Sequence, residues 1–109
     1  LGHAIEKASR YEVSHGMAVV KGMALMFRIS ACEGWCDASL EEAFLALIDE
    51  YDYDASIDCG ADELIEYVKA DKKRSGDYID IVIPCEMNEC KIKRLLVTEL
   101  ASLLKRYLR

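Results

Sequence analysis

The sequence has 109 residues, a formal net charge of −6 and 52% hydrophobic residues. This is the length of one domain, with enough apolar material for an ordinary core. The acidic balance argues against non-specific nucleic-acid binding, for which a basic face is expected. No apolar run is long enough to span a bilayer and no signal peptide is visible, so we expect no membrane association. Because the chain begins with Leu rather than Met, we expect a fragment of a longer protein or a processed chain.

The cysteines are five in number and irregularly spaced, whereas a small secreted scaffold usually has an even and dense set. Two of them are four residues apart and fit one helix face, but no second pair has the spacing of a zinc ribbon. We therefore expect reduced, mostly buried thiols in a cytoplasmic protein. The five are Cys32, Cys36, Cys59, Cys85 and Cys90.

The first elements are helical. Residues 1–9 read as a short helix, and a long helix is expected from an N-cap at Ser14 to about Glu33, where Gly34 is a usual C-terminal signal. Apolar residues cover so much of the long helix that we expect it at the centre of the core. Two neighbouring stripes carry them, Val20, Ala24, Phe27 and Ala31 on one and Val19, Met23 and Met26 on the other.

The long helix also has one basic face, formed by Lys21 and Arg28, which are seven residues apart. We expect this face to be a solvent-exposed edge. In the following helix, Ser39 and Glu42 have the spacing of a capping box. The side chains expected to face inward are those of Leu40, Phe44, Leu47 and Ile48.

The second half begins with a short amphipathic helix at residues 61–71, acidic in its first turn. The period then changes to alternation in "DYIDIVIP", which predicts a strand with Ile79, Ile81 and Ile83 on one face. Pro84 is expected to end this strand, residues 85–89 to turn, and residues 90–95 to return as a second strand before a helix from about Val97. The predicted fold class is mainly α, with four or five helices and one small β-hairpin that must pack on them.

The two histidines are His3 and His15, each beside a glycine. On one unbroken helix they would lie about 18 Å apart and about 120° around the axis, so they can share a cavity only if the chain folds back between them. A helix that starts at His15 favours the neutral imidazole, the form that binds metals, and Gly16 leaves room for a ligand. The alternatives are a structural histidine at a helix start and, for His3, an ordinary contact with Glu6 three residues later.

The segment "KADKKRSG" places four cations within six residues of an acidic chain. A solvated helix end is the usual interpretation, and a loop that grips a phosphate or carboxylate is the alternative. No phosphate-cradling glycine loop or dinucleotide fingerprint is present, so we do not expect this chain itself to hold a nucleotide in the usual way.

Four segments occur in the order "GHAIE", "HGMAV–KGM", "ADELIEY–K–DKK" and a strand ending in Pro. Together they resemble the C-terminal domain of 3-dehydroquinate synthase, a sugar-phosphate cyclase. The resemblance implies conversion of 3-deoxy-D-arabino-heptulosonate 7-phosphate to 3-dehydroquinate in the shikimate pathway. It also implies NAD, held by an N-terminal Rossmann-like domain, a divalent metal (zinc or cobalt), a sugar-phosphate substrate in the cleft between the domains, and a homodimer.

The same resemblance implies roles for individual residues. His15 matches the metal-ligating histidine of the family's "HGE" segment. His3 matches the second histidine of "GHxxGHA", which contacts the substrate and is placed for proton transfer. Lys72 and Lys73 fall on "DKK", which supplies a lysine to the anionic substrate, and which of the two does so stays open.

The chain departs from the family pattern in ways that matter. The family's first histidine, also a metal ligand, would precede Leu1, a third ligand is a glutamate from the N-terminal side, and Met17 stands where "HGE" has Glu. Residues 1–109 are thus predicted to form one metal- and substrate-binding domain that is inactive alone, since a catalytic zinc normally has three protein ligands. The alternatives are another sugar-phosphate cyclase, a metal-dependent alcohol or glycerol dehydrogenase domain, and a non-catalytic helical binding module.

Overall fold

The structure is a computed structural model that describes residues 2–10, 12–57, 59–69, 78–86 and 89–108. Within these residues the chain forms five helices and one antiparallel hairpin, so the predicted mainly α fold class is confirmed. The elements in chain order are α1 (Gly2–Ala8), α2 (His15–Cys32), α3 (Ala38–Glu50), α4 (Ala61–Lys69), β1 (Tyr78–Glu86), β2 (Glu89–Leu96) and α5 (Val97–Tyr107).

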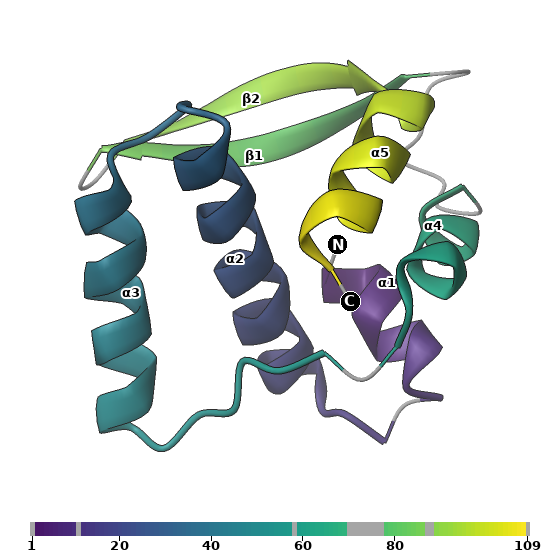
Figure 1. Ribbon diagram of the computed structural model, residues 1–109. Coiled ribbons are helices and arrows are strands. Elements are labelled where there is room, and N and C mark those ends of the chain that lie inside the picture. Colours follow the sequence, from purple (N-terminus) through teal and green to yellow (C-terminus); the bar gives the residue numbers. More distant parts are fainter. Residues whose placement is uncertain (1, 11, 58, 70–77, 87–88, 109) are drawn as a thin grey trace.

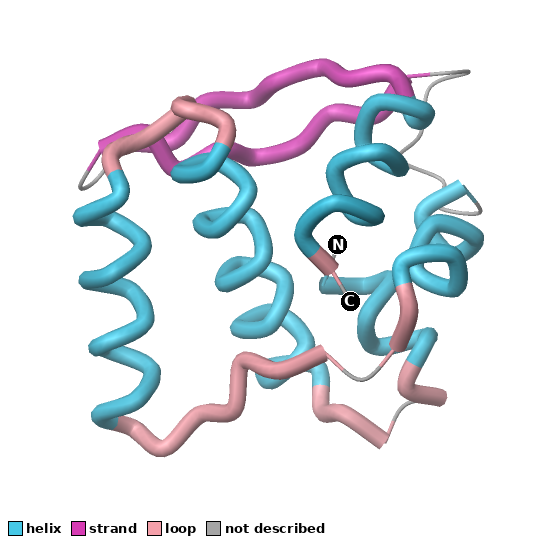
Figure 2. Tube along the Cα trace, viewed as in Figure 1, coloured by secondary structure: helices cyan, strands magenta, loops and turns pink. Residues whose placement is uncertain are grey.

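The helices lie together, and the hairpin runs along one side of them (Figure 1). Helix α2 is central, as its apolar stripes predicted, because it contacts α1, α3, α5 and β1. Helix α3 lies at one edge against α2, and α4 contacts α1 and α5. The same path coloured by secondary structure shows an extended connection from α3 to α4 that passes below α2 (Figure 2). This connection lies at the opposite end of α2 from the hairpin.

Both predicted ends of α2 are confirmed. The Ser14 hydroxyl accepts a hydrogen bond from the backbone N–H of Met17 at 3.2 Å, as an N-cap does. At the other end Gly34 adopts φ +77°, and the N–H of Trp35 donates to the carbonyl of Ser30 at 2.7 Å. This is a Schellman ending, and its positive φ is a conformation that glycine adopts without strain.

The expectation that Lys21 is solvent-exposed is wrong. Its side chain is buried, with 7% of the residue exposed, and its ammonium donates a hydrogen bond to the carbonyl of Ser56 in the α3–α4 connection. Burial of a lysine is tolerated when its ammonium finds such an acceptor. Arg28 is exposed, as expected. Of the stripe formed by Val19, Met23 and Met26, which was expected in the core, Met26 is buried but Val19 and Met23 are exposed.

Helix α3 begins one residue before the predicted cap. The N-cap is Asp37, whose carboxylate accepts the N–H of Ser39 at 3.0 Å, and hydrogen bonding to Ser39 lowers the pKa of that carboxyl. Phe44 stacks on Phe27 of α2 with ring centroids 4.6 Å apart. Leu47, expected to face inward, is 52% exposed, because α3 packs against little besides α2.

The hairpin has the predicted faces, but both of its strands extend further toward each other than predicted. Ile79, Ile81 and Ile83 are buried against the helices. The strand does not end at Pro84, as expected, but continues to Glu86 with an irregular register between these two residues. Each strand of a hairpin has one unpaired edge, and proline is tolerated in such edge strands.

The core joins α2, α4 and α5, and its largest fully buried apolar side chains are Ile29, Leu64, Leu100 and Leu104. The expectation of mostly buried thiols is wrong for the cysteines whose side chains are described. Among them, Cys32 and Cys90 are exposed, and Cys36 and Cys59 are partly buried. None of the described helices combines the length and the apolar character needed to cross a membrane.

Candidate functional site

The fold brings both histidines to one carboxylate. Nδ1 of His15, the first residue of α2, lies 3.1 Å from Oε2 of Glu6, which belongs to α1. Nδ1 of His3 lies 4.0 Å from Oε1 of the same side chain. The backward bend expected between the histidines is therefore present, and Glu6 stands between the two rings.

Local interactions explain this reversal. The Ser9 hydroxyl donates to the carbonyl of Glu6 at 2.8 Å and accepts the N–H of Val13 at 3.2 Å, which ties the end of α1 to the approach of α2. The helices then meet closely at Gly2, where a Cβ atom would lie 3.4 Å from backbone atoms of Ala18 and Val19. A methyl group at Gly2 would be in ordinary van der Waals contact with α2, so the packing of the two helices does not by itself require the glycine beside His3.

A hollow of about 570 Å³ lies beside the rings, and we call it the histidine hollow. Its wall is formed by α1, α2, the hairpin and α5, and most of its lining is apolar. It is open to solvent at the rings, since the side chains of His3 and His15 are 54% and 75% exposed. The apolar residues that share this lining with the histidines include Val19, Met23, Phe27, Ile79, Val82 and Leu100.

Asp80 also lines the histidine hollow but is engaged elsewhere. Its two carboxylate oxygens accept hydrogen bonds from the guanidinium of Arg94 on the paired strand, at 2.9 and 3.2 Å. This bidentate contact lowers the pKa of Asp80 and keeps its charge balanced on the strand surface. The carboxylate that faces the imidazoles is that of Glu6.

The donors fit one part of a metal site. With Nδ1 of His15 donating to Glu6, its Nε2 lone pair is left for a metal, as in the carboxylate–histidine arrangement common around zinc. Within the described ranges, no group of three or more His, Cys, Asp or Glu side chains is placed to hold an ion. A catalytic zinc normally has three protein ligands, so further ligands would have to come from outside these residues.

The other predicted site residues are less informative. Lys72 and Lys73 lie outside the described residues. Lys69 is the last residue of α4, just before them in sequence, and its Nζ lies 3.8 Å from Oε1 of Glu66. At Gly16 a Cβ atom would meet nothing within 4 Å, so no close-packed neighbour requires this glycine.

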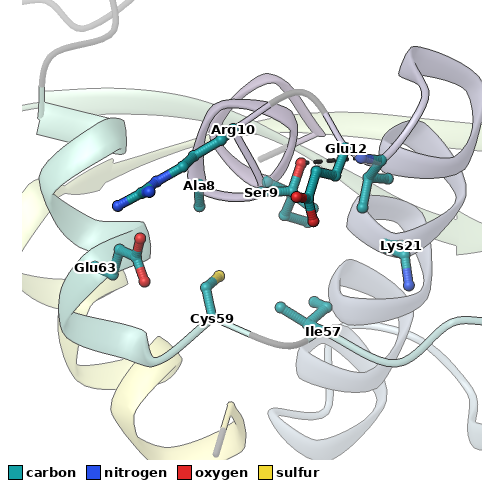
Figure 3. A pocket seen from close by; sticks show the side chains of 10 residues that line it. Ala8, Ser9, Arg10, Glu12, Lys21, Ile57, Cys59 and Glu63 are labelled. Carbon is teal, nitrogen blue, oxygen red and sulfur yellow. Dashed lines mark hydrogen bonds between the residues drawn. The ribbon is translucent and has the colours of Figure 1, made fainter.

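A second hollow, of about 340 Å³, lies on the Lys21 side of α2 (Figure 3). Lys21 lines it from α2, Glu12 from the segment before α2, and Glu63 from α4. The side chain of Arg10 extends toward the helix that carries Glu63. No sequence pattern pointed to this hollow, because Lys21 was expected to face solvent.

The sequence pattern also did not predict that Glu6 links the two histidines. The spacing of three residues predicted its contact with His3, but the closer contact with His15 spans nine residues and depends on the reversal. The sequence did contain one clue, namely a carboxylate in the first helix and a histidine at the start of the second. It becomes meaningful only once the two helices are known to fold against each other.

Fold and site together define a small helical domain that presents two imidazoles at an open hollow, with the Glu6 carboxylate in contact with the rings. A family model described as 3-dehydroquinate synthase C-terminal matches residues 1–74. The chain is 34% identical to the 3-dehydroquinate synthase of Picrophilus torridus over 110 residues, which cover 95% of this chain and 31% of that protein. It is 32% identical to that of Dictyoglomus thermophilum over 84% of the chain and 26% of that protein.

A third relative, the 3-dehydroquinate synthase of a Thermoanaerobacter species, is 30% identical over 96% of this chain and 30% of its own length. The chain thus belongs to the 3-dehydroquinate synthase C-terminal family. It spans about a third of the length of these curated relatives.

Proposed function

We propose that this chain is the helical part of a 3-dehydroquinate synthase, a carbon–oxygen lyase that closes 3-deoxy-D-arabino-heptulosonate 7-phosphate to 3-dehydroquinate with loss of phosphate. The observation that carries the proposal is the placement of His3 and His15 on either side of Glu6 at one hollow. Membership of the family and the names of the relatives support the same activity.

In this proposal each side chain has one task. His15 holds a divalent metal through Nε2, and His3 exchanges a proton with the substrate beside it. Either Lys72 or Lys73 binds the negative charge of the substrate, for which a lysine acts as a point charge. When bound, the metal (zinc or cobalt) supplies Lewis-acid polarisation of a hydroxyl, and NAD takes and returns hydride.

The rest of the site is proposed to come from the part of the relatives that this chain does not span. That part would hold NAD, supply the remaining metal ligands and close the histidine hollow from outside, and two copies would form a homodimer in the cytoplasm. The chain alone would then be inactive. The openness of the hollow at both rings is compatible with such a lid, because 54% and 75% of the two histidine side chains are exposed.

The test is a product assay on the protein encoded by the whole reading frame that carries this sequence. We expect heptulosonate phosphate to yield phosphate and 3-dehydroquinate in equal amounts. The His15→Ala variant should lose more than about 100-fold in kcat/KM, since changes around a metal ligand already cost about 10–100-fold. The matched control is Lys105→Ala on α5, an exposed residue that pairs with Asp62 at 3.7 Å and should leave activity unchanged.

Two results would contradict the proposal. Phosphate release without dehydroquinate would indicate a cyclase that acts on another sugar. A reading frame that starts near Leu1 would indicate a non-catalytic helical module, because it would lack the roughly 200–250 upstream codons that a Rossmann-like domain needs.

A further inference from the structure

We propose that Glu6 is a positioning residue that selects the tautomer of His15 and orients its ring toward the histidine hollow. The inference rests on the proposed function only for what the oriented ring then does. No part of the family resemblance assigned a role to Glu6.

Burial shows which of the three side chains is fixed. Only 13% of the Glu6 side chain is exposed, compared with 75% for His15 and 54% for His3. Glu6 is held in α1 one turn from the Ser9 anchor, whereas both rings project toward solvent. An exposed imidazole would sample several orientations, so the contact with a nearly buried carboxylate decides which one is populated.

The chemistry of the contact decides the tautomer. An ionised carboxylate accepts hydrogen bonds and donates none, so the proton must sit on Nδ1 of His15, 3.1 Å from Oε2 of Glu6. The lone pair of the neutral ring is then on Nε2. A free neutral imidazole side chain favours the opposite tautomer, with the proton on Nε2. Glu6 therefore turns His15 into a ring whose outward nitrogen can bind a metal.

His3 is coupled to the same carboxylate more weakly. Its Nδ1 is 4.0 Å from Oε1 of Glu6, which is beyond hydrogen-bond distance. Each oxygen of Glu6 thus faces one ring, and the His15 contact is the stronger. A change at Glu6 should alter His15 clearly and His3 only slightly.

The test is long-range proton–nitrogen NMR of the two histidines in the folded 109-residue chain. We would record it at a pH of about 8.5, about two units above the ordinary histidine value. The chemical shifts of Nδ1 and Nε2 report directly which nitrogen carries the proton. In the unsubstituted chain we expect His15 to be mostly the Nδ1–H tautomer, and in Glu6→Ala mostly the Nε2–H tautomer.

The matched control is Glu12→Ala. Glu12 is only three residues from His15 in sequence, but it lines the second hollow (Figure 3), whereas the ion pairs of both rings within the described residues are with Glu6. It should leave both tautomers unchanged. Glu6→Gln keeps the shape and an amide oxygen acceptor but loses the charge, so it should give an intermediate ratio. It also decides the question if Glu6→Ala does not fold.

The inference is overturned if His15 carries its proton mostly on Nε2 in the unsubstituted chain. It is also overturned if the tautomer ratio of His15 in the Glu6 variants is the same as in the unsubstituted chain. This readout involves neither metal nor substrate. A tautomer that follows Glu6 in a protein that makes no dehydroquinate would therefore sustain the inference and reject the proposed function. Where the proposed function holds, Glu6→Gln in the longer protein should weaken zinc binding about 10–100-fold.

Discussion

Glu33, the C-cap residue of α2, shows what a single carboxylate can hold at the residue scale. The Tyr107 hydroxyl at the end of α5 donates to its Oε2 at 2.6 Å, and Arg106 donates to the same oxygen at 3.2 Å. The contacts join helices that are more than seventy residues apart in sequence. The hydrogen bond to Glu33 raises the pKa of Tyr107 above its ordinary value of 10.0.

This shift predicts a pH dependence with a definite sign. Because the pKa of Tyr107 is raised in the folded state, its contribution to stability is complete below pH 10.0 and is lost as the pH rises through the folded value. The difference in unfolding free energy between the unsubstituted chain and Tyr107→Phe should thus stay constant up to about pH 9 and shrink as the pH rises above 10.0. Urea unfolding measures it, with exposed Tyr51→Phe as a control that should show no such trend.

Individual residues also mark the limit of sequence reasoning. The spacing of Glu6 and His3 was enough to predict their proximity, because it depends on one turn of helix. The burial of Lys21 was not predictable, since the acceptor for its ammonium is the carbonyl of Ser56, 35 residues later. Nothing in the local pattern distinguishes such a lysine from an exposed one.

At the scale of elements, α2 is the one on which the site depends most. Its N-cap, Ser14, immediately precedes His15 and fixes where the helix begins. Removal of an N-cap hydroxyl costs about 0.5–2 kcal/mol. We expect Ser14→Ala to lower the unfolding free energy by about 1 kcal/mol.

Urea unfolding measures this change too, and Ser102→Ala is the matched control. Ser102 lies inside α5 and is exposed, and among the residues that the structure describes its hydroxyl bonds only to the carbonyl of Thr98 in its own helix. Its loss should change the unfolding free energy by less than about 0.5 kcal/mol. Equal effects of the two substitutions would show that Ser14 does not act as a cap.

Periodicity predicted the elements better than their ends. The helices beginning at His15 and Val97 and the inward face of Ile79, Ile81 and Ile83 follow from apolar spacing alone. The start of α3 did not follow, because Asp37 and Ser39 are both good cap residues, and it is the Asp37 carboxylate that accepts the N–H of Ser39. The exposure of α3 likewise depends on how few neighbours it has.

At the scale of the whole molecule, the reversal between α1 and α2 creates the site. It could be anticipated, because two histidines twelve residues apart can share a cavity only if the chain turns back. The shape of the histidine hollow could not, since it needs the hairpin and α5, which lie more than sixty residues further along the chain. Val19 and Met23 line this open hollow, and both are exposed rather than buried.

The proposed function requires that His15 be one ligand of a metal site completed by residues outside this chain. Zinc titration calorimetry, run on the 109-residue chain and on the longer protein, tests it most directly. We expect weak or no binding by the chain alone and tight one-to-one binding by the longer protein that His15→Ala abolishes. Tight binding by the chain alone that is lost in His15→Ala, or tight binding by the longer protein that survives it, would contradict the account.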